Sequence, residues 1–208
     1  MLGDTKKHIV LLGAMLASVA VAGPIQRIHN DKVVSLDYTL KPGETAHLAN
    51  RPAVTVYFDN GSVQITGKDG QTSRKQVMTG ETVFGNVIAI RNTGTSDLKF
   101  DRTEFLTAGN DESWGHTGLA PNYKVLIENK YARVYDIKIP AHDREPQHTH
   151  HARVVVCLSG AELKHLMPDG REEPSTLRTG EVAWRRAATH IGQNLGDTNL
   201  WVIAIEPK

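Results

Sequence analysis

The turn residues of this 208-residue chain recur in its second half at a nearly constant distance, and this recurrence constrains the fold most. Asp69-Gly70 returns as Asp169-Gly170, and Thr79-Gly80-Glu81 returns as Thr179-Gly180-Glu181, each displaced by 100 residues. Nearer the C-terminus the displacement grows to 102 residues. Common turn dipeptides recurring by chance would not keep one offset. The period is too long for a solenoid, so we interpret it as a duplicated domain.

Between these turns the chain consists of short runs of strand-forming residues. Val33 to Leu40 alternates, and residues 54–58 and 62–66 flank Asp59-Asn60-Gly61 as in a hairpin. No run between residues 33 and 106 has a convincing helical period. Many short strands separated by Gly-rich turns are typical of a closed sandwich or barrel, so we expect an all-β protein.

The composition changes once between the two repeats. Residues 107–121 are rich in Gly, Asn, Asp, Ser and Pro, which interrupt regular structure, and strand-forming runs resume at Tyr123. We therefore expect a first barrel over residues 33–106, a linker over 107–121 and a second barrel over 122–208.

The first 22 residues have the pattern of a secretory signal. Lys6 and Lys7 precede the uncharged run Ile9 to Ala22, which ends in Ala20-Val21-Ala22. We expect cleavage after Ala22 and a secreted or periplasmic protein. The run is shorter than the roughly 20 apolar residues of a membrane span, so no stable span is expected after cleavage. A buried helix or an uncleaved anchor is the alternative.

Charge and cysteine content narrow the function classes. The chain carries 24 Lys plus Arg against 23 Asp plus Glu and has no dense basic run, so we expect no nucleic-acid partner. Cys157 is the only cysteine, which excludes an intrachain disulfide. Its apolar neighbours predict a small buried side chain and no nucleophile.

Two histidines of the second repeat form the strongest candidate site. His148 and His150 are two residues apart, so a strand would point both to one face, and we expect Val154 and Val156 to follow them inward. Two imidazoles on one face of a strand are suited to a metal.

These residues also resemble the paired motifs of the cupin superfamily, whose fold is a double-stranded β-helix or jelly roll. The matching positions, in chain order, are His148, His150, Gly160, Gly180, His190 and Asn194. The first family motif also has a Glu, and that slot holds Arg153 or Val154 here, depending on the direction of counting. The resemblance implies two tandem jelly-roll barrels, a bicupin, covering nearly the whole chain after residue 22.

The resemblance further implies that His148, His150 and His190 bind a divalent metal ion. Fe²⁺ is favoured, with Mn²⁺, Ni²⁺ and Zn²⁺ as alternatives. Loss of the Glu leaves a neutral three-His shell, which preserves the full charge of the ion as a Lewis acid. The first repeat has Leu48, Asn50 and Ile88 at the matching positions, and Leu and Ile cannot bind a metal. We interpret that half as structural or partner-binding.

Other polar residues near the site are assigned by position alone. Strand alternation predicts that Arg153 points away from the histidines; pointing inward, it could bind a substrate carboxylate. Glu145 is predicted to be a solvated loop carboxylate, with a fourth ligand or a base as the alternative. His151 is expected on the opposite face, and His142 and His165 at the surface.

Residues 184–186, Trp-Arg-Arg, either form a pocket wall or serve ordinary packing. Two classes of function remain open. The first is a metal-dependent enzyme acting on a small organic molecule, either an Fe(II) dioxygenase or an isomerase or lyase. The second is a non-catalytic exported protein that binds a small ligand. No catalytic residue is assigned, and a homodimer is expected only by analogy with cupins.

Overall fold

The computed structural model describes residues 23–109 and 119–208. The expected signal peptide, residues 1–22, lies outside this part of the chain, as does most of the expected linker. The described residues form eighteen β-strands and no helix, so none of their segments is a helix long and apolar enough to cross a membrane.

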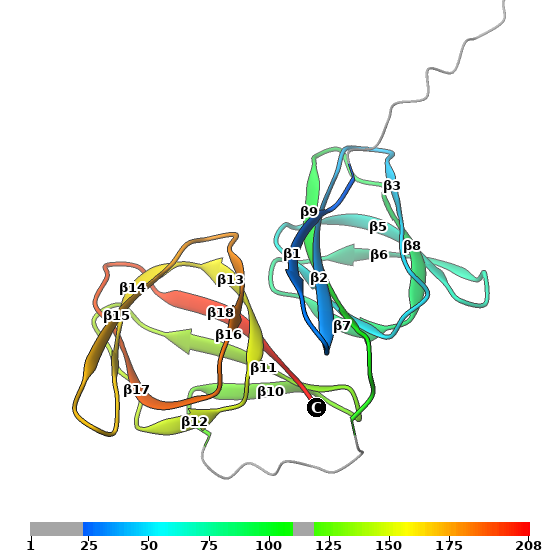
Figure 1. The fold of residues 1–208 in the computed structure, drawn as a ribbon. Helices are drawn as coiled ribbons and strands as arrows, with labels where there is room; N and C mark the ends of the chain where they lie inside the picture. The colour runs from blue at the N-terminus through cyan, green and yellow to red at the C-terminus, as the bar shows by residue number, and fades with distance from the viewer. Residues whose placement is uncertain (1–22, 110–118) are drawn as a thin grey trace, which may run out of the picture.

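The first nine strands close into one barrel of two antiparallel sheets (Figure 1). The five-stranded sheet contains, in spatial order, β1 (Ile25–His29), β2 (Val33–Leu40), β9 (Leu98–Phe105), β4 (Ala53–Tyr57) and β7 (Thr82–Gly85). The four-stranded sheet contains β3 (Thr45–His47), β8 (Val87–Asn92), β5 (Gly61–Gly67) and β6 (Thr72–Val77).

The last nine strands repeat this arrangement with the same spatial order. Their five-stranded sheet contains β10 (Tyr123–Glu128), β11 (Ala132–Ile139), β18 (Leu200–Pro207), β13 (Arg153–Ser159) and β16 (Val182–Arg185). Their four-stranded sheet contains β12 (His148–His150), β17 (Ala188–Asn194), β14 (Ala161–Leu166) and β15 (Glu172–Leu177). The predicted all-β fold of two tandem jelly-roll barrels is thereby confirmed.

The recurring Asp-Gly turns have the same backbone conformation and hydrogen bonds in both barrels. Gly70 and Gly170 have φ angles of 78° and 85°, which residues with a Cβ adopt only with strain. The preceding aspartates accept hydrogen bonds from backbone N–H groups two residues on, at 3.1 Å in each barrel. The constant offset that marked the repeat therefore reflects turn chemistry between β5 and β6 and between β14 and β15.

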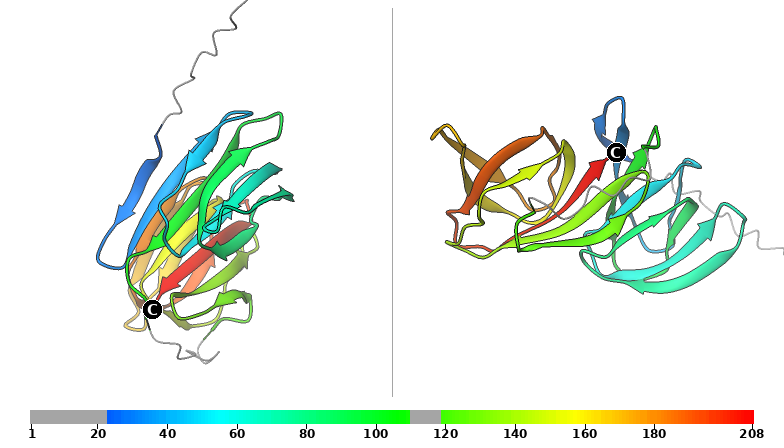
Figure 2. Two further views of the ribbon diagram at one scale, coloured as in Figure 1. Left: turned by 90° about the vertical axis from the view of Figure 1, so that its right-hand side faces the viewer. Right: turned by 90° about the horizontal axis from the view of Figure 1, so that it is seen from below.

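The two five-stranded sheets contribute to one shared apolar core. The right-hand view of Figure 2 shows the two barrels side by side. Val54, Val56 and Phe105 of the first barrel belong to the same apolar cluster as Ile203 and Ile205 of the second. Each of these side chains is almost fully removed from water. The hydrophobic effect thus stabilises the pair of barrels as a unit.

Val154 and Val156 also belong to this shared core, so the prediction that they point toward the histidines is wrong. Val155 and Cys157 face the inside of the second barrel instead. The reason is that β12 and β13 belong to different sheets, and the break at His151 and Ala152 resets the alternation. Cys157 is fully buried and free, as its apolar neighbours predicted.

Two strands, β1 and the three-residue β3, were not predicted. The first of them, β1, has little that a sequence pattern could detect. Of its five residues only Ile28 is buried, so it carries no alternating pattern that a sequence could reveal. It forms the edge of the first sheet by pairing with β2, and a register shift between Gln26 and Ile28 bends it.

Candidate metal centre

The three predicted histidines meet inside the second barrel. β12 and β17 are antiparallel neighbours, and His148 lies directly opposite His190 in their register. His150 shares the face of His148 because strand side chains alternate. Each of the three offers a nitrogen within 4.8 Å of the others, and none is more than 5% exposed.

The nitrogen positions fit a bound cation. His148 Nδ1 lies 2.9 Å from the Pro146 carbonyl oxygen and donates to it, which leaves the lone pair on Nε2. His150 Nδ1 faces a carboxylate oxygen of Glu206 at 4.0 Å, which favours the proton on that nitrogen. The two Nε2 atoms lie 2.7 Å apart, a hydrogen bond when one of them carries the proton. With both protons on Nδ1, the two Nε2 lone pairs would be available to one cation.

Burial keeps these imidazoles neutral. Desolvation lowers the pKa of His148 and His150, and the nearby Arg153 guanidinium lowers both further. Burial, followed by the neighbouring His165, lowers the pKa of His190 to about 3. Metal binding requires unprotonated imidazole, so at neutral pH the three rings are in the state that a metal needs.

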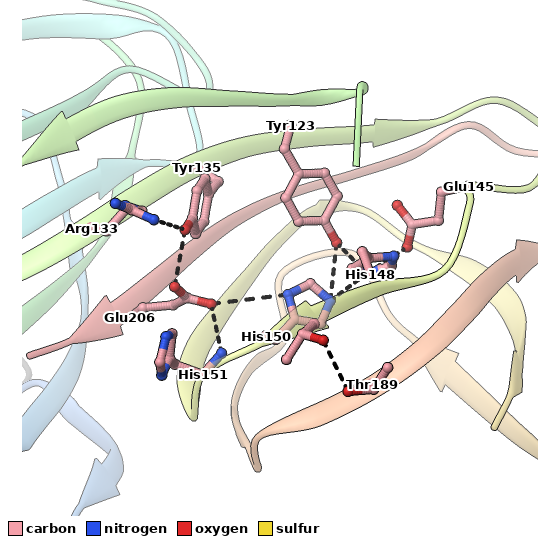
Figure 3. A network of polar contacts seen from close by, with 10 residues as sticks. Tyr123, Arg133, Tyr135, Glu145, His148, His150, His151, Thr189 and Glu206 are labelled. Atoms are coloured by element: carbon pink, nitrogen blue, oxygen red, sulfur yellow. Dashed lines mark hydrogen bonds and ion pairs between the residues drawn. The ribbon is translucent and has the colours of Figure 1, made fainter. Parts of the chain in front are cut away.

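Tyr123 is a site residue that the sequence did not reveal. Its hydroxyl lies 3.0 Å from His148 Nε2 and 3.0 Å from His150 Nε2 (Figure 3). Its single O–H can donate to only one of these nitrogens. Burial, and then the charge of Glu145, raise the pKa of Tyr123 well above its ordinary value. The phenol therefore stays neutral and acts as a hydrogen-bond donor at the centre.

Glu145 is buried beside the histidines, so its prediction as a solvated loop carboxylate is wrong. One carboxylate oxygen lies 3.3 Å from His148 Nε2, and the other accepts a hydrogen bond of 3.1 Å from Asn122. Its backbone N–H donates to the Gly192 carbonyl oxygen at 3.0 Å. A Cβ at Gly192 would come 2.5 Å from the carboxylate, so any other residue here would displace the end of the Glu145 side chain. Burial raises the pKa of Glu145 to about 7.

A chain of polar side chains, Glu206, Tyr135 and Arg133, lies on the Nδ1 side of His150 (Figure 3). Glu206 accepts hydrogen bonds from the Tyr135 hydroxyl at 3.0 Å and from the His151 backbone N–H at 3.1 Å. Arg133 donates to the Tyr135 hydroxyl at 3.2 Å. Carboxylates that face the outer nitrogen of a ligating imidazole hold its orientation and tautomer.

Two of the three histidines line a cavity of about 420 Å³. His150 and His190 share its wall with Tyr123 and Glu145. Much of the remaining wall is apolar, formed by the buried residues Ile137, Val155, Leu163, Leu177, Leu200 and Val202. The cavity is large enough for a small organic molecule, and polar side chains from β13 to β16 also line it.

Two further predictions about this region are wrong. Arg153 lines the cavity and does not point away from the histidines, because β13 begins a new alternation. His165 also lines the cavity, and its ring stacks on that of His190 at 4.3 Å and 2°. His142 is exposed and pairs with Asp197 at 2.9 Å, in agreement with its expected place at the surface.

Residues 184–186 were expected either to form a pocket wall or to serve ordinary packing, and each alternative applies to some of them. Trp184 packs against the core shared by the two barrels. Arg185 and Arg186 line the cavity. Packing therefore applies to the tryptophan, and a pocket wall to the two arginines.

The first barrel is filled where the second is open. Arg102 is fully buried on β9, donates to the Arg51 carbonyl oxygen at 3.0 Å and pairs with Glu104 at 3.2 Å. Arg102 on β9 pairs with Thr55 on β4, and Ala204 on β18 pairs with the equivalent residue Val155 on β13. Ala204, which lines the cavity, is therefore the counterpart of Arg102. An arginine thus occupies in the first barrel the space that alanine leaves in the second.

Comparison with known proteins supports the fold. No protein-family model matches the chain, and neither does any curated protein. AerE from Microcystis aeruginosa is 14% identical, with a TM-score of 0.56 over 89% of this chain and 97% of its own. A variant of oxalate decarboxylase from Bacillus subtilis is 16% identical, with a TM-score of 0.53 over 84% of this chain and 68% of its own. At such identities the likeness concerns the fold. The chain therefore has the fold of the cupin superfamily in its two-barrel form, with a buried group of three histidines in the C-terminal barrel.

Proposed function

We propose that this protein is a metal-dependent enzyme that acts on a small organic molecule in the cavity of its C-terminal barrel. The observation that carries the proposal is a group of three buried, neutral imidazoles, two of which, His150 and His190, line that cavity. His148, His150 and His190 would hold the ion, with Fe²⁺ favoured and Mn²⁺, Ni²⁺ or Zn²⁺ as alternatives. When bound, the ion would supply Lewis-acid or redox chemistry at the open end of the cavity.

Glu145 favours proton-transfer chemistry, as in an isomerase or lyase. Its carboxylate lines the cavity next to His148, and Asn122 and Gly192 hold it in place. A carboxylate fixed at the edge of a substrate cavity can accept a proton from a bound molecule and return it elsewhere. Tyr123 can donate a hydrogen bond at the same end.

A dioxygenase is the second candidate, favoured by the neutral three-His shell and the apolar cavity wall. Such a wall excludes water and suits an apolar substrate. The two candidates differ in what they consume, because only the dioxygenase takes up O₂. Oxygen uptake and exchange of substrate C–H with deuterium from solvent, measured on the Fe²⁺-loaded protein with a panel of small organic acids, distinguish them.

The metal site itself is tested by metal analysis of the purified protein. We expect near-stoichiometric divalent metal in the wild type and loss of most of it in His148→Ala and His190→Ala. His142→Ala is the matched control, because that histidine is exposed and should leave the metal content unchanged. Equal metal content in all four proteins would refute the site.

The reaction class is tested with Glu145→Gln. We expect this variant to keep its metal, because all three histidines remain, and to lose deuterium exchange into the substrate. Full exchange activity in the variant would exclude Glu145 as the base. If no organic acid is turned over by either reaction but several bind, the non-catalytic ligand-binding function is the better account.

Export is part of the same proposal, supported by the basic and apolar pattern of residues 1–22. The protein recovered from the periplasm or medium should have the intact mass of residues 23–208, with Gly23 as its first residue. A full-length mass in the cell interior would contradict export.

A further inference from the structure

Arg153 is a buried cation that makes no ion pair with the described residues, although the charges of Glu206 and Glu145 act on it from a longer distance. The residue is 9% exposed and lines the cavity together with His150 and His190. Its Nε and Nη1 atoms are buried and have no hydrogen-bond partner among the described residues. Burying an unpaired guanidinium is costly, and proteins rarely retain one without a partner.

The acidic side chains nearby are already engaged. Glu145 interacts with His148 and Asn122, and Glu206 accepts hydrogen bonds from Tyr135 and His151. Neither carboxylate lies within ion-pair distance of Arg153.

Arg185 adds positive charge beside Arg153. It stands directly opposite Arg153 in the register of β13 and β16 and also lines the cavity. Arg185 is paired with Glu181 at 3.4 Å, so of these two register neighbours Arg153 is the one left without a carboxylate partner among the described residues.

The first barrel shows what this wall looks like without a site. The matching pair there is Ala53 and Gly85, in the same register. The buried arginine of that barrel, Arg102, donates to the carbonyl oxygens of Ala49, Arg51 and Val87. Arg102 thus bonds through Nε and Nη2 to Glu104 and to backbone carbonyl oxygens and leaves only Nη1 without a partner, whereas Arg153 leaves both Nε and Nη1 without one and lines an open cavity.

We propose that Arg153 binds the carboxylate group of a small organic acid with an apolar body. The planar guanidinium fork matches a carboxylate with two parallel hydrogen bonds, and the apolar wall of Ile137, Val155 and Leu163 accommodates the hydrocarbon part. This assignment rests on the proposed function for its substrate role. The binding step is separate from metal binding, because Arg153 is not one of the proposed ligands.

The test is calorimetric titration of the full mature chain, metal-free and metal-loaded, with benzoate, phenylacetate and acetate. Benzamide, which has the shape of benzoate without its charge, is the ligand control. We expect benzoate or phenylacetate to bind the wild type and benzamide to bind at least about tenfold more weakly, the loss expected for charged hydrogen bonds.

Arg153→Gln should weaken carboxylate binding at least about tenfold, and Arg153→Lys should have an intermediate effect, because it keeps the charge and loses the fork. Arg171→Gln is the matched control, since Arg171 lies on an exposed turn and pairs with Asp169. Equal binding by wild type and Arg153→Gln, or no binding of any of the three acids, overturns the proposal. Binding of inorganic phosphate in place of the acids also overturns it.

A measurement on the unaltered protein covers the case in which Arg153→Gln fails to fold. The ¹⁵N resonance of the Arg153 Nε–H group, assigned by its disappearance in Arg153→Lys, should shift on addition of benzoate and stay in place with benzamide. An unmoved resonance at saturating benzoate contradicts the assignment. Metal analysis of the same samples separates the two proposals: intact metal content with no carboxylate binding refutes Arg153 alone.

Discussion

At the scale of single residues, the site depends on close contacts between a few side chains and their immediate neighbours. Gly192 is the clearest case, because Glu145 occupies the space in which any other residue would place its Cβ. Tyr123 is another, since its hydroxyl is fixed between two imidazole nitrogens. Each of these positions is sensitive to small changes.

Gly192→Ala should displace the Glu145 carboxylate and abolish deuterium exchange into the substrate while the metal content stays near that of the wild type. The added Cβ would lie 2.5 Å from a carboxylate oxygen, well inside normal contact. Gly85→Ala is the matched control, because a Cβ there meets only ordinary contacts at 3.9 Å. Unchanged exchange activity in Gly192→Ala would show that Glu145 does not take part.

Asp101 provides a pH-dependent prediction away from the metal centre. Burial, and then the charge of Asp37, raise the pKa of Asp101 from 3.8 to about 7, although Ser35 and Thr103 donate hydrogen bonds to it. Between these two pH values the unfolded chain releases this proton while the folded chain keeps it. Asp101 therefore makes the free energy of unfolding fall as pH rises from about 4 to about 7, with no further change above.

In Asp101→Asn this contribution is absent. The difference in unfolding free energy, variant minus wild type, should rise by about 2–4 kcal/mol between pH 4 and pH 8. Denaturant titrations at both pH values measure it. A difference that is constant across this range would mean that the Asp101 carboxyl is ionised in the folded protein at both ends.

At the scale of elements, the loop between β11 and β12 is fixed to β17 by the side chain of Asn194. Asn194 donates from its side chain to the carbonyl oxygens of Ile139, Pro140 and Thr198. Asn92 makes the equivalent bonds to Leu40 and Ser96 in the first barrel. Because both barrels keep this residue, the asparagine serves the fold in each.

Asn92→Ala and Asn194→Ala should each lower the free energy of unfolding by about 2–3 kcal/mol, because each leaves buried carbonyl groups without donors. Only Asn194→Ala should also lower metal affinity, since its loop carries Glu145 to His148. Denaturant unfolding and a competitive metal titration measure the two effects. Equal metal affinity in both variants would separate the loop from the metal centre.

The sequence predicted most of the strands from local spacing, the repeat from the constant offset of its turns, and the three histidines from the family motifs. It did not place Arg153, since the break between β12 and β13 reverses which residues face inward. Tyr123 and His165 reach the site through strand pairing and packing, which no local pattern encodes. Glu145, three residues before His148, was considered as a ligand or base, but its burial depends on the contact of its loop with Gly192.

At the scale of the whole molecule, the two barrels share one apolar core and should unfold together. Ile205→Ala removes a fully buried side chain from this core and should cost about 2–5 kcal/mol. We expect a single calorimetric transition in both wild type and variant, coincident with the change in tryptophan fluorescence. Two separated transitions in the wild type would show that the barrels are independent.

The shared core also explains why a barrel without a metal site is retained beside one that has it. Val154 and Val156 press β13 against the first barrel on one side, while Arg153 and Val155 of the same strand face the cavity on the other. The first barrel therefore packs against β13, the strand that carries the anion-binding arginine, and holds it in position. Selection for substrate recognition in one half would then preserve packing residues in the other half that never meet the substrate.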